Sequence, residues 1–391
     1  MKYVPYGKHW LDKKDIEEVI KVLNSDWITQ GPKIKEFEEA LCEYTGAKYA
    51  VAVSSGTAGL HIACLAAGIK EGDEVITSPI TFVASANCIL YCRAKPVFAD
   101  IQEDTVNIDP KEIKKKLTKK TKAIIPVHFA GHPCDLEEIR KISKKHQLTV
   151  IEDACHALGA EYKGSKIGAC KYSDMTVFSF HPVKSITTGE GGAVLTNNKR
   201  LYEKLIILRH HGIAKERRKF IKRLEGEWYY EMQMLGFNYR ITDFQCALGI
   251  SQLKKLNKFI RKRRKLAKIY NEKLSKLSGI ILPTERPYVK SSWHIYCIKV
   301  AKTNWRRVIY ERLRSMGIGV QIHYIPIYFH PFYKKHLGCG KSICPNAEKY
   351  YATTITLPLY PSLSVNSLDY VVKSLKKVMR TLQQRKESSN E

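Results

Sequence analysis

The sequence of 391 residues lacks several patterns that would assign it to a protein class at once. Its 11 cysteines, scattered between Cys42 and Cys344, include no CxxC pair, which argues against a zinc ribbon, a dithiol redox motif and a disulfide scaffold. The opening residues contain no apolar segment of the signal-peptide type, so we expect no export by that route. We therefore expect a protein of the reducing cytoplasm.

Long apolar runs are also scarce. Two uncharged stretches, 50–69 and 75–92, approach the length of a membrane span, but Ser54–Thr57 interrupts the first and Thr77–Pro79 interrupts the second. Each stretch is better explained as a buried strand, a turn and a helix. We expect no segment that crosses a membrane.

Acidic residues are few beside the basic ones, with 38 Asp and Glu against 66 Lys and Arg. The longest basic run holds nine Lys or Arg and no acid between Lys254 and Lys268. Such a run suggests either a nucleic-acid surface or the solvated outer face of an amphipathic helix. We favour the solvated face, because no aromatic platform for bases and no DNA-binding motif accompanies the run.

Short apolar runs alternate with helix-length segments from residue 49 onward, which is typical of βαβ units and a mostly parallel sheet. A long helix over 243–276, with an apolar stripe, separates this region from a smaller α+β region. We predict an α/β protein with a large domain over 1–245 and a small C-terminal domain over 246–391. The expected strands of the large domain are 49–53, 74–77, 95–99, 123–127, 149–152, 175–180 and 192–196.

Three segments of the predicted large domain can carry chemistry. Ser54–Gly59 follows a strand and opens a helix, so its N–H groups and hydroxyls can face a phosphate, although the chain has neither GxGxxG nor GxxxxGK[ST]. Asp153 follows a second buried strand, at the sheet edge where ligands of open α/β folds bind, and a helix-capping role is the alternative. Lys184 follows a third strand and precedes a Gly-rich turn.

A phosphate anchor, a carboxylate and a desolvated lysine together indicate pyridoxal phosphate chemistry, since that cofactor needs all three groups. No metal site is expected. His128 and His132 have the i, i+4 spacing of a metal pair, but Gly131 and Pro133 favour a loop there over the helix that such a pair requires.

Nearly the whole chain, from about residue 6 to 382, resembles the DegT/DnrJ/EryC1/StrS family of sugar aminotransferases. The resemblance implies the type I aminotransferase fold, pyridoxal phosphate as cofactor and a ping-pong transamination with L-glutamate as the usual amino donor. Relatives that catalyse 3-dehydration carry His at the position of Lys184, so transamination is expected here. The segments that carry the resemblance are Trp27–Pro32, Ser55–Ala58, Glu152–Ala154, Ser179–Lys184 with Thr188–Gly192, and Gly236–Asp243.

The resemblance also assigns roles around the cofactor. Lys184 is similar to the Schiff-base lysine that carries the proton, and Asp153 to the carboxylate that pairs with the ring nitrogen. Phe82 resembles the residue stacked on the ring, and His156 lies at the position near the ring hydroxyl. The resemblance assigns the phosphate to Gly56, Thr57, Ala58 and Ser179 and, from the neighbouring subunit, to Asn238, which implies a homodimer with shared sites.

Within the family, the chain looks most like enzymes that form UDP-4-amino-4,6-dideoxy-N-acetyl-β-L-altrosamine for pseudaminic acid. The implied acceptor is a UDP-linked 2-acetamido-2,6-dideoxy-4-keto-hexose. Two alternatives stay open: a 4-aminotransferase for a bacillosamine, perosamine or aminoarabinose precursor, and a nucleic-acid-binding regulator on the same fold. The implied substrate contacts are Tyr6, Asp26, Trp27, Ile28, Thr29, His323, Tyr324, Ile325 and Pro326.

Overall fold

The computed structural model describes residues 3–214, 220–222, 226–338 and 342–387. The helices are α1 (Lys13–Leu23), α2 (Pro32–Thr45), α3 (Gly56–Ala66), α4 (Ala84–Tyr91), α5 (Pro110–Lys115), α6 (Leu136–His146), α7 (Lys199–Arg209), α8 (Asp243–Leu274), α9 (Thr303–Ser315), α10 (Pro331–Leu337), α11 (Pro345–Thr353) and α12 (Val365–Glu387). The strands are β1 (Tyr49–Val53), β2 (Glu74–Thr77), β3 (Lys95–Phe98), β4 (Thr121–Ile125), β5 (Thr149–Asp153), β6 (Glu161–Tyr162), β7 (Ser165–Lys166), β8 (Met175–Ser179), β9 (Gly192–Thr196), β10 (Ile213–Ala214), β11 (Glu231–Met232), β12 (Ile280–Ile281), β13 (Val289–Lys290), β14 (Tyr296–Val300) and β15 (Thr354–Leu357).

The central sheet has seven strands in the order β1-β9-β8-β5-β4-β2-β3. The strands from β8 to β3 pair in parallel, while β9 runs antiparallel to both of its neighbours. Almost every side chain of β1, β2, β8 and β9 is buried, because helices cover both faces, and this explains why these strands consist mainly of apolar residues. The predicted α/β class with a mostly parallel sheet is confirmed.

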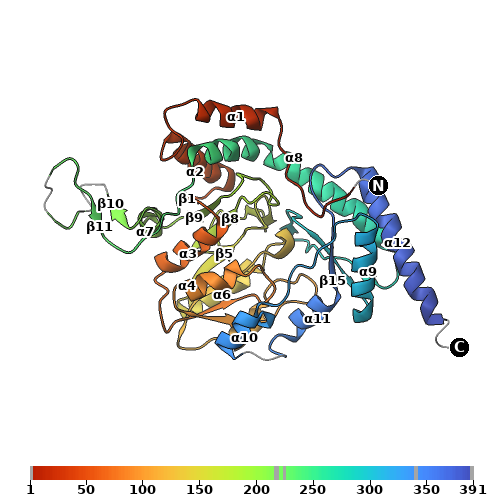
Figure 1. The fold of residues 1–391 in the computed structure, drawn as a ribbon. Coiled ribbons are helices and arrows are strands. Elements are labelled where there is room, and N and C mark those ends of the chain that lie inside the picture. Colours follow the sequence, from red (N-terminus) through yellow and green to blue (C-terminus); the bar gives the residue numbers. More distant parts are fainter. Residues whose placement is uncertain (1–2, 215–219, 223–225, 339–341, 388–391) are drawn as a thin grey trace.

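A second hydrophobic core lies in the C-terminal part of the chain. It packs the antiparallel sheet β12-β14-β15 against α9, α12 and the C-terminal half of α8. Helix α8 runs past both parts: its N-terminal half contacts α1 and α2, and its C-terminal half contacts α12 (Figure 1). The division at residues 245 and 246 falls inside this continuous helix and stays a prediction.

The segment before α1 does not lie on the central sheet. Val4 forms a parallel bridge with Ile318, and the carbonyl oxygen of Tyr6 accepts a hydrogen bond from the Leu359 N–H at 3.1 Å. The N-terminal segment thereby contacts the C-terminal part of the chain, and Tyr6 lies beside the carboxyl edge of the central sheet.

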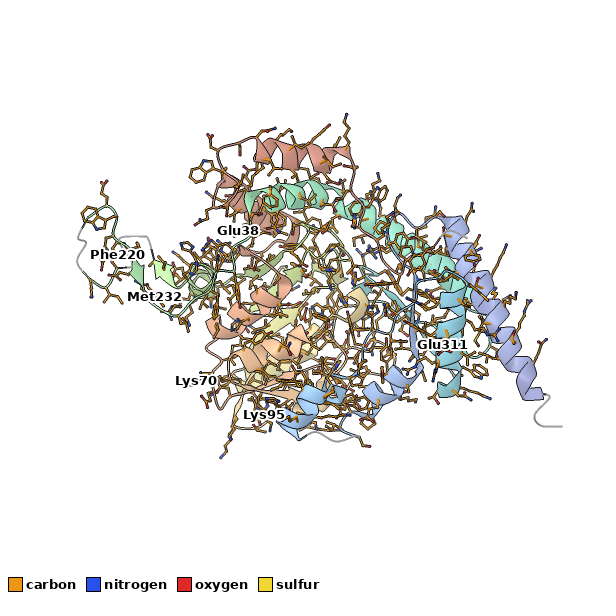
Figure 2. The ribbon with its side chains drawn as sticks, in the orientation of Figure 1. Glu38, Lys70, Lys95, Phe220, Met232 and Glu311 are labelled. Atoms are coloured by element: carbon orange, nitrogen blue, oxygen red, sulfur yellow. The ribbon has the colours of Figure 1, made fainter. Side chains whose placement is uncertain are left out.

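The β10–β11 hairpin projects away from the body of the molecule, and Phe220 and Met232 lie on this arm (Figure 2). Several of its large apolar side chains are exposed, including Trp228 and Met232. Within the described residues, no helix combines the length with the apolar composition needed to cross a bilayer.

Candidate active site

A cavity of about 650 Å³ opens at the carboxyl edge of the central sheet. It lies where β1, β5 and β8 end, which is the position at which open α/β sheets bind ligands. Eleven residues singled out from the sequence line it: Tyr6, Gly56, Thr57, Phe82, Asp153, His156, Ser179, Lys184, His323, Tyr324 and Ile325.

The N-terminus of α3 forms one wall of the cavity. Ser55 caps the helix, and its Oγ accepts a hydrogen bond from the Ala58 N–H at 3.1 Å. The N–H groups of Gly56 and Thr57 belong to the first turn, where a helix leaves its donors free for an anion. Gly56 is required by close packing, because a Cβ at this position would lie 2.8 Å from Ser179 Cβ.

Asp153 ends β5 and is buried, with 6% of its surface exposed. Its two carboxylate oxygens have different partners: Ser85 Oγ donates to Oδ2 at 2.6 Å, and the Cys155 N–H donates to Oδ1 at 3.2 Å. Acceptor positions remain on both oxygens for a further donor from the cavity.

Lys184 lies in the loop between β8 and β9. Its N–H donates to the His181 carbonyl oxygen at 2.9 Å, and Thr188 N–H closes the turn on the Phe180 carbonyl oxygen at 3.0 Å. Burial lowers the pKa of the Lys184 amine, while the charges of Cys155 and Asp153 act in the opposite direction. A lysine of this kind reaches its neutral, nucleophilic form more readily than one in water.

Neutral histidines form the opposite wall. The rings of His156 and His294 are tilted by 39° with their centroids 4.3 Å apart, and burial lowers the pKa of both well below the usual range. His323 donates to or accepts from Thr356 Oγ1 at 2.8 Å, and burial lowers its pKa to about 4. The Nδ1 atoms of His156 and His294 are buried without a hydrogen-bond partner among the described residues.

His294 and Ser85 carry polar groups of this site that the sequence did not reveal. His294 is brought to the cavity by a turn at Trp293, which has a φ of 49° and whose neighbour Ser292 donates through Oγ to the His156 carbonyl oxygen at 2.7 Å. His294 lies two residues before β14 in the structure, and its own segment contains no pattern that distinguishes a site residue.

Phe82 lies at the cavity with 58% of its surface exposed, so one face is free for a ligand ring. Tyr6 lies near His323, with ring centroids 5.6 Å apart, and burial raises the pKa of its hydroxyl. These two positions are compatible with the roles expected of them, which stay predictions.

Other residues singled out from the sequence lie outside the cavity wall. The Ala58 N–H is occupied by Ser55, Asn238 pairs with His210, and Pro326 is buried beside the wall. Residues 26–29 follow α1 and are tied to the start of α8, where Thr29 pairs with Thr242. The side chains of Trp27 and Ile28 are more than half exposed, at 57% and 51%.

The basic run on α8 is only partly the solvated face that we expected. Arg263 is fully buried, and its Nη1 donates to the carbonyl oxygens of His294 at 2.8 Å and Leu359 at 2.9 Å. Lys262 lies over the ring of Trp10, with Nζ 4.2 Å from the centroid, and Lys265 is exposed. The run therefore holds the N-terminal segment and the C-terminal core together.

The two histidines with metal-like spacing have other partners. His128 Nε2 lies 2.6 Å from Glu152 Oε2, and its Nδ1 accepts from the Cys134 N–H at 3.1 Å. His132 Nε2 accepts from the Arg286 N–H at 3.2 Å. In the described part of the chain, no three His, Cys, Asp or Glu side chains converge as a metal ion requires.

Comparison with known proteins assigns the family. The model of the DegT/DnrJ/EryC1/StrS aminotransferase family matches residues 10–376. The chain belongs to this family. Membership implies an aminotransferase that uses pyridoxal phosphate.

Two relatives of this aminotransferase cover almost its whole length. The uncharacterized protein MJ1066 of Methanocaldococcus jannaschii is 47% identical over 381 residues, covering 96% of this chain and 98% of that protein. The UDP-4-amino-4,6-dideoxy-N-acetyl-beta-L-altrosamine transaminase of Campylobacter jejuni is 41% identical over 377 residues, covering 95% of this chain and 96% of that protein. The second relative supports nucleotide-sugar aminotransfer.

Two solved structures share the fold of this aminotransferase. Helicobacter pylori PseC, an aminotransferase involved in the biosynthesis of pseudoaminic acid, has a TM-score of 0.90 and 36% identity, covering 97% of this chain and 100% of that one. A putative sugar aminotransferase of Streptococcus pneumoniae in its PLP form has a TM-score of 0.90 and 31% identity, covering 97% of this chain and 99% of that one.

Proposed function

We propose that this aminotransferase transfers the amino group of L-glutamate to C4 of a UDP-linked 2-acetamido-2,6-dideoxy-4-keto-hexose. The product would be UDP-4-amino-4,6-dideoxy-N-acetyl-β-L-altrosamine, an intermediate for pseudaminic acid. The proposal rests on one observation above the others: Lys184 and Asp153 line the same cavity, in a chain 41% identical to a transaminase of that name.

The residues of the cavity fit pyridoxal phosphate. Gly56 leaves the α3 N-terminus open where a Cβ would contact Ser179, and the free first-turn N–H groups suit the phosphate. His156 Nδ1 is a buried polar atom without a partner among the described residues, which suits a ligand oxygen at this wall. Asp153 keeps acceptor positions for the ring N–H, and Phe82 has an exposed face for the ring.

The bound cofactor would supply an electrophilic carbonyl for the amino donor and an electron-withdrawing ring. The protein's own contribution would begin with Lys184 Nζ. Its lowered pKa suits this amine to accept a proton from the α-carbon of the amino donor and to return one at the carbonyl carbon of the cofactor. Asp153 would hold the ring nitrogen protonated by its charge. Tyr6 and His323 are placed to bond the hydroxyls or the diphosphate of the sugar nucleotide.

We also propose a cytoplasmic homodimer with shared sites. The exposed positions of Trp27 and Ile28, and the place of Asn238 outside the cavity of its own subunit, are compatible with contacts across a dimer. In that arrangement residues 26–29 and Asn238 would serve the neighbouring cavity.

The deciding experiment uses protein loaded with pyridoxamine phosphate and a panel of 4-keto sugars linked to UDP, GDP or dTDP. Turnover confined to the UDP-linked 2-acetamido sugar, followed by the return of the pyridoxal phosphate absorbance, would support the proposal. Turnover only with a GDP- or dTDP-linked sugar would redirect it to one of the other 4-aminotransferases. Lys184→Ala should abolish the exchange, and Lys171→Ala, at an exposed position outside the cavity, should leave it unchanged.

A further inference from the structure

Ser85 is buried directly behind the cavity, on helix α4, which follows the loop that carries Phe82. It lies in the first turn of α4 with none of its surface exposed, and it is not among the described residues that line the cavity wall. Its hydroxyl therefore has no route to a ligand except through Asp153, whose Oδ2 lies 2.6 Å from Ser85 Oγ.

The direction of the hydrogen bonds follows from the inventory of donors. An ionised carboxylate can only accept, so Ser85 must donate its single hydrogen to Asp153. Thr81 Oγ1 lies 2.7 Å from Ser85 Oγ, and because that serine hydrogen is already used, Thr81 must be the donor in this pair. The two hydroxyls thus form a chain that points toward Asp153, and each bond polarises the next.

Competing partners are weaker. The Phe82 carbonyl oxygen is the alternative acceptor for the Ser85 hydrogen, at the longer distance of 3.4 Å. Cys155 also bonds to the carboxylate, through its N–H at the longer distance of 3.2 Å and through its thiol, which is a weak donor. Hydrogen bonds to a charged group are short when they are strong, so Ser85 is the main restraint on the carboxylate.

We infer that Ser85, backed by Thr81, is a positioning residue that fixes the Asp153 carboxylate for the ring nitrogen of the cofactor. This inference rests on the proposed function, because it needs a cofactor ring in the cavity. Since α4 holds Ser85 and the preceding loop holds Phe82, one segment of chain sets both the carboxylate below the ring nitrogen and the aromatic side chain beside the ring.

Several groups face Asp153 from other elements and must be considered in any pH titration. They are the Lys184 amine, the Cys155 and Cys134 thiols and the Tyr324 hydroxyl; burial dominates the pKa of each, and the charge of Asp153 acts on all of them. A carboxylate that rotates away would hold the protonated cofactor less well.

The test uses the full-length protein with pyridoxal phosphate and needs no substrate. We expect Ser85→Ala to weaken cofactor binding by about tenfold, because one hydrogen bond to a charged group is lost. We also expect it to lower the pKa of the bound cofactor's ring nitrogen by about half a unit to one unit, measured as the pH midpoint of the absorbance change. The melting temperature of the apo-protein separates this effect from a loss of folding. It should fall by only a few degrees, because alanine suits a helix and the Asp153 carboxylate lines the cavity, where water can bond to it.

Two further variants make the result specific. Ser85→Thr keeps the hydroxyl and should restore the midpoint and the affinity. Ser143→Ala removes another buried serine hydroxyl, which in the described structure bonds to the Arg140 carbonyl oxygen on α6, and should change neither. Wild-type affinity and midpoint in Ser85→Ala, or failure of Ser85→Thr to restore them, would overturn the inference. Failure of the wild type to bind the cofactor would overturn the proposed function instead, and this inference with it.

Discussion

Tyr324 Oη lies 3.2 Å from His156 Nε2, and the two groups fix each other's hydrogen positions. Burial raises the pKa of Tyr324 far above its usual range and lowers that of His156, so both groups are neutral at pH 7. Either group can be the donor in this pair, and with Tyr324 as the donor the remaining proton of His156 resides on Nδ1. We expect this tautomer, because it leaves Nδ1–H as a donor for a ligand oxygen at the wall of the cavity.

Tyr324→Phe should remove the hydrogen bond that fixes the tautomer of His156. We expect cofactor affinity and kcat/KM to fall about fivefold, which corresponds to one hydrogen bond of about 1 kcal/mol. Equilibrium binding of pyridoxal phosphate measures the change. Tyr328→Phe is the control, because Tyr328 is also buried but donates to Glu348, away from the cavity. Equal losses in both variants would contradict the assigned role of Tyr324.

Gly192→Ala should disturb the phosphate end of the cavity from outside it. A Cβ at Gly192 would lie 2.6 Å from the backbone carbonyl carbon of Ser55, the residue that caps α3. We expect overpacking to lower the free energy of unfolding by about 1–3 kcal/mol and to weaken cofactor binding. Urea denaturation with cofactor titration tests both. Gly7→Ala, with its nearest contact at 3.8 Å from Val183 Cγ1, should leave stability unchanged.

Acid should destabilise the fold through His132. Burial lowers its pKa to about 4 from an ordinary value near 6.5. Between these pH values the unfolded chain binds more protons than the folded one, so stability rises with pH and is lost as the pH falls from 6.5 toward 4.

We expect His132 to account for a loss of about 1–2 kcal/mol between pH 7 and pH 5. Urea denaturation at the two pH values should show a smaller difference for His132→Gln than for the wild type. His146→Gln, at an exposed position on α6, should keep the wild-type pH dependence. An unchanged difference in His132→Gln would show that other groups cause the acid sensitivity.

Much of the fold was predictable because it depends on local pattern. Strands such as β1 and β9 lie between two layers of helices, so most of their side chains are apolar and their boundaries could be predicted to the residue. Gly56, Asp153 and Lys184 could also be grouped in advance, since each follows a strand whose end meets the same sheet edge.

The remainder depends on contacts between distant segments. His294 reaches the cavity because the turn at Trp293 packs against residues 130–131. No pattern in its own segment predicts that contact. Ser85 differs from other helix serines only through Asp153, 68 positions later in the chain. Arg263 stands among eight other basic residues, and its burial follows from three carbonyl oxygens supplied by other segments.

The last prediction concerns Arg263, which is buried, and compares it with the exposed Lys265 of the same basic run on α8. Burial lowers its pKa to about 10, so the guanidinium is charged at neutral pH and is held by the carbonyl oxygens of Trp293, His294 and Leu359. Arg263→Met removes the donor and leaves these buried oxygens without it, which outweighs the relief of burying a charge.

We expect Arg263→Met to lower the free energy of unfolding by about 3 kcal/mol, and Lys265→Met, on the exposed side of α8, to change it by less than about 0.5 kcal/mol. Urea denaturation compares the two. Because Arg263 also holds the backbone of His294, a cavity residue, its loss should reduce cofactor affinity at temperatures where the variant is still folded. Two variants of equal stability would mean that the run is a solvated face throughout.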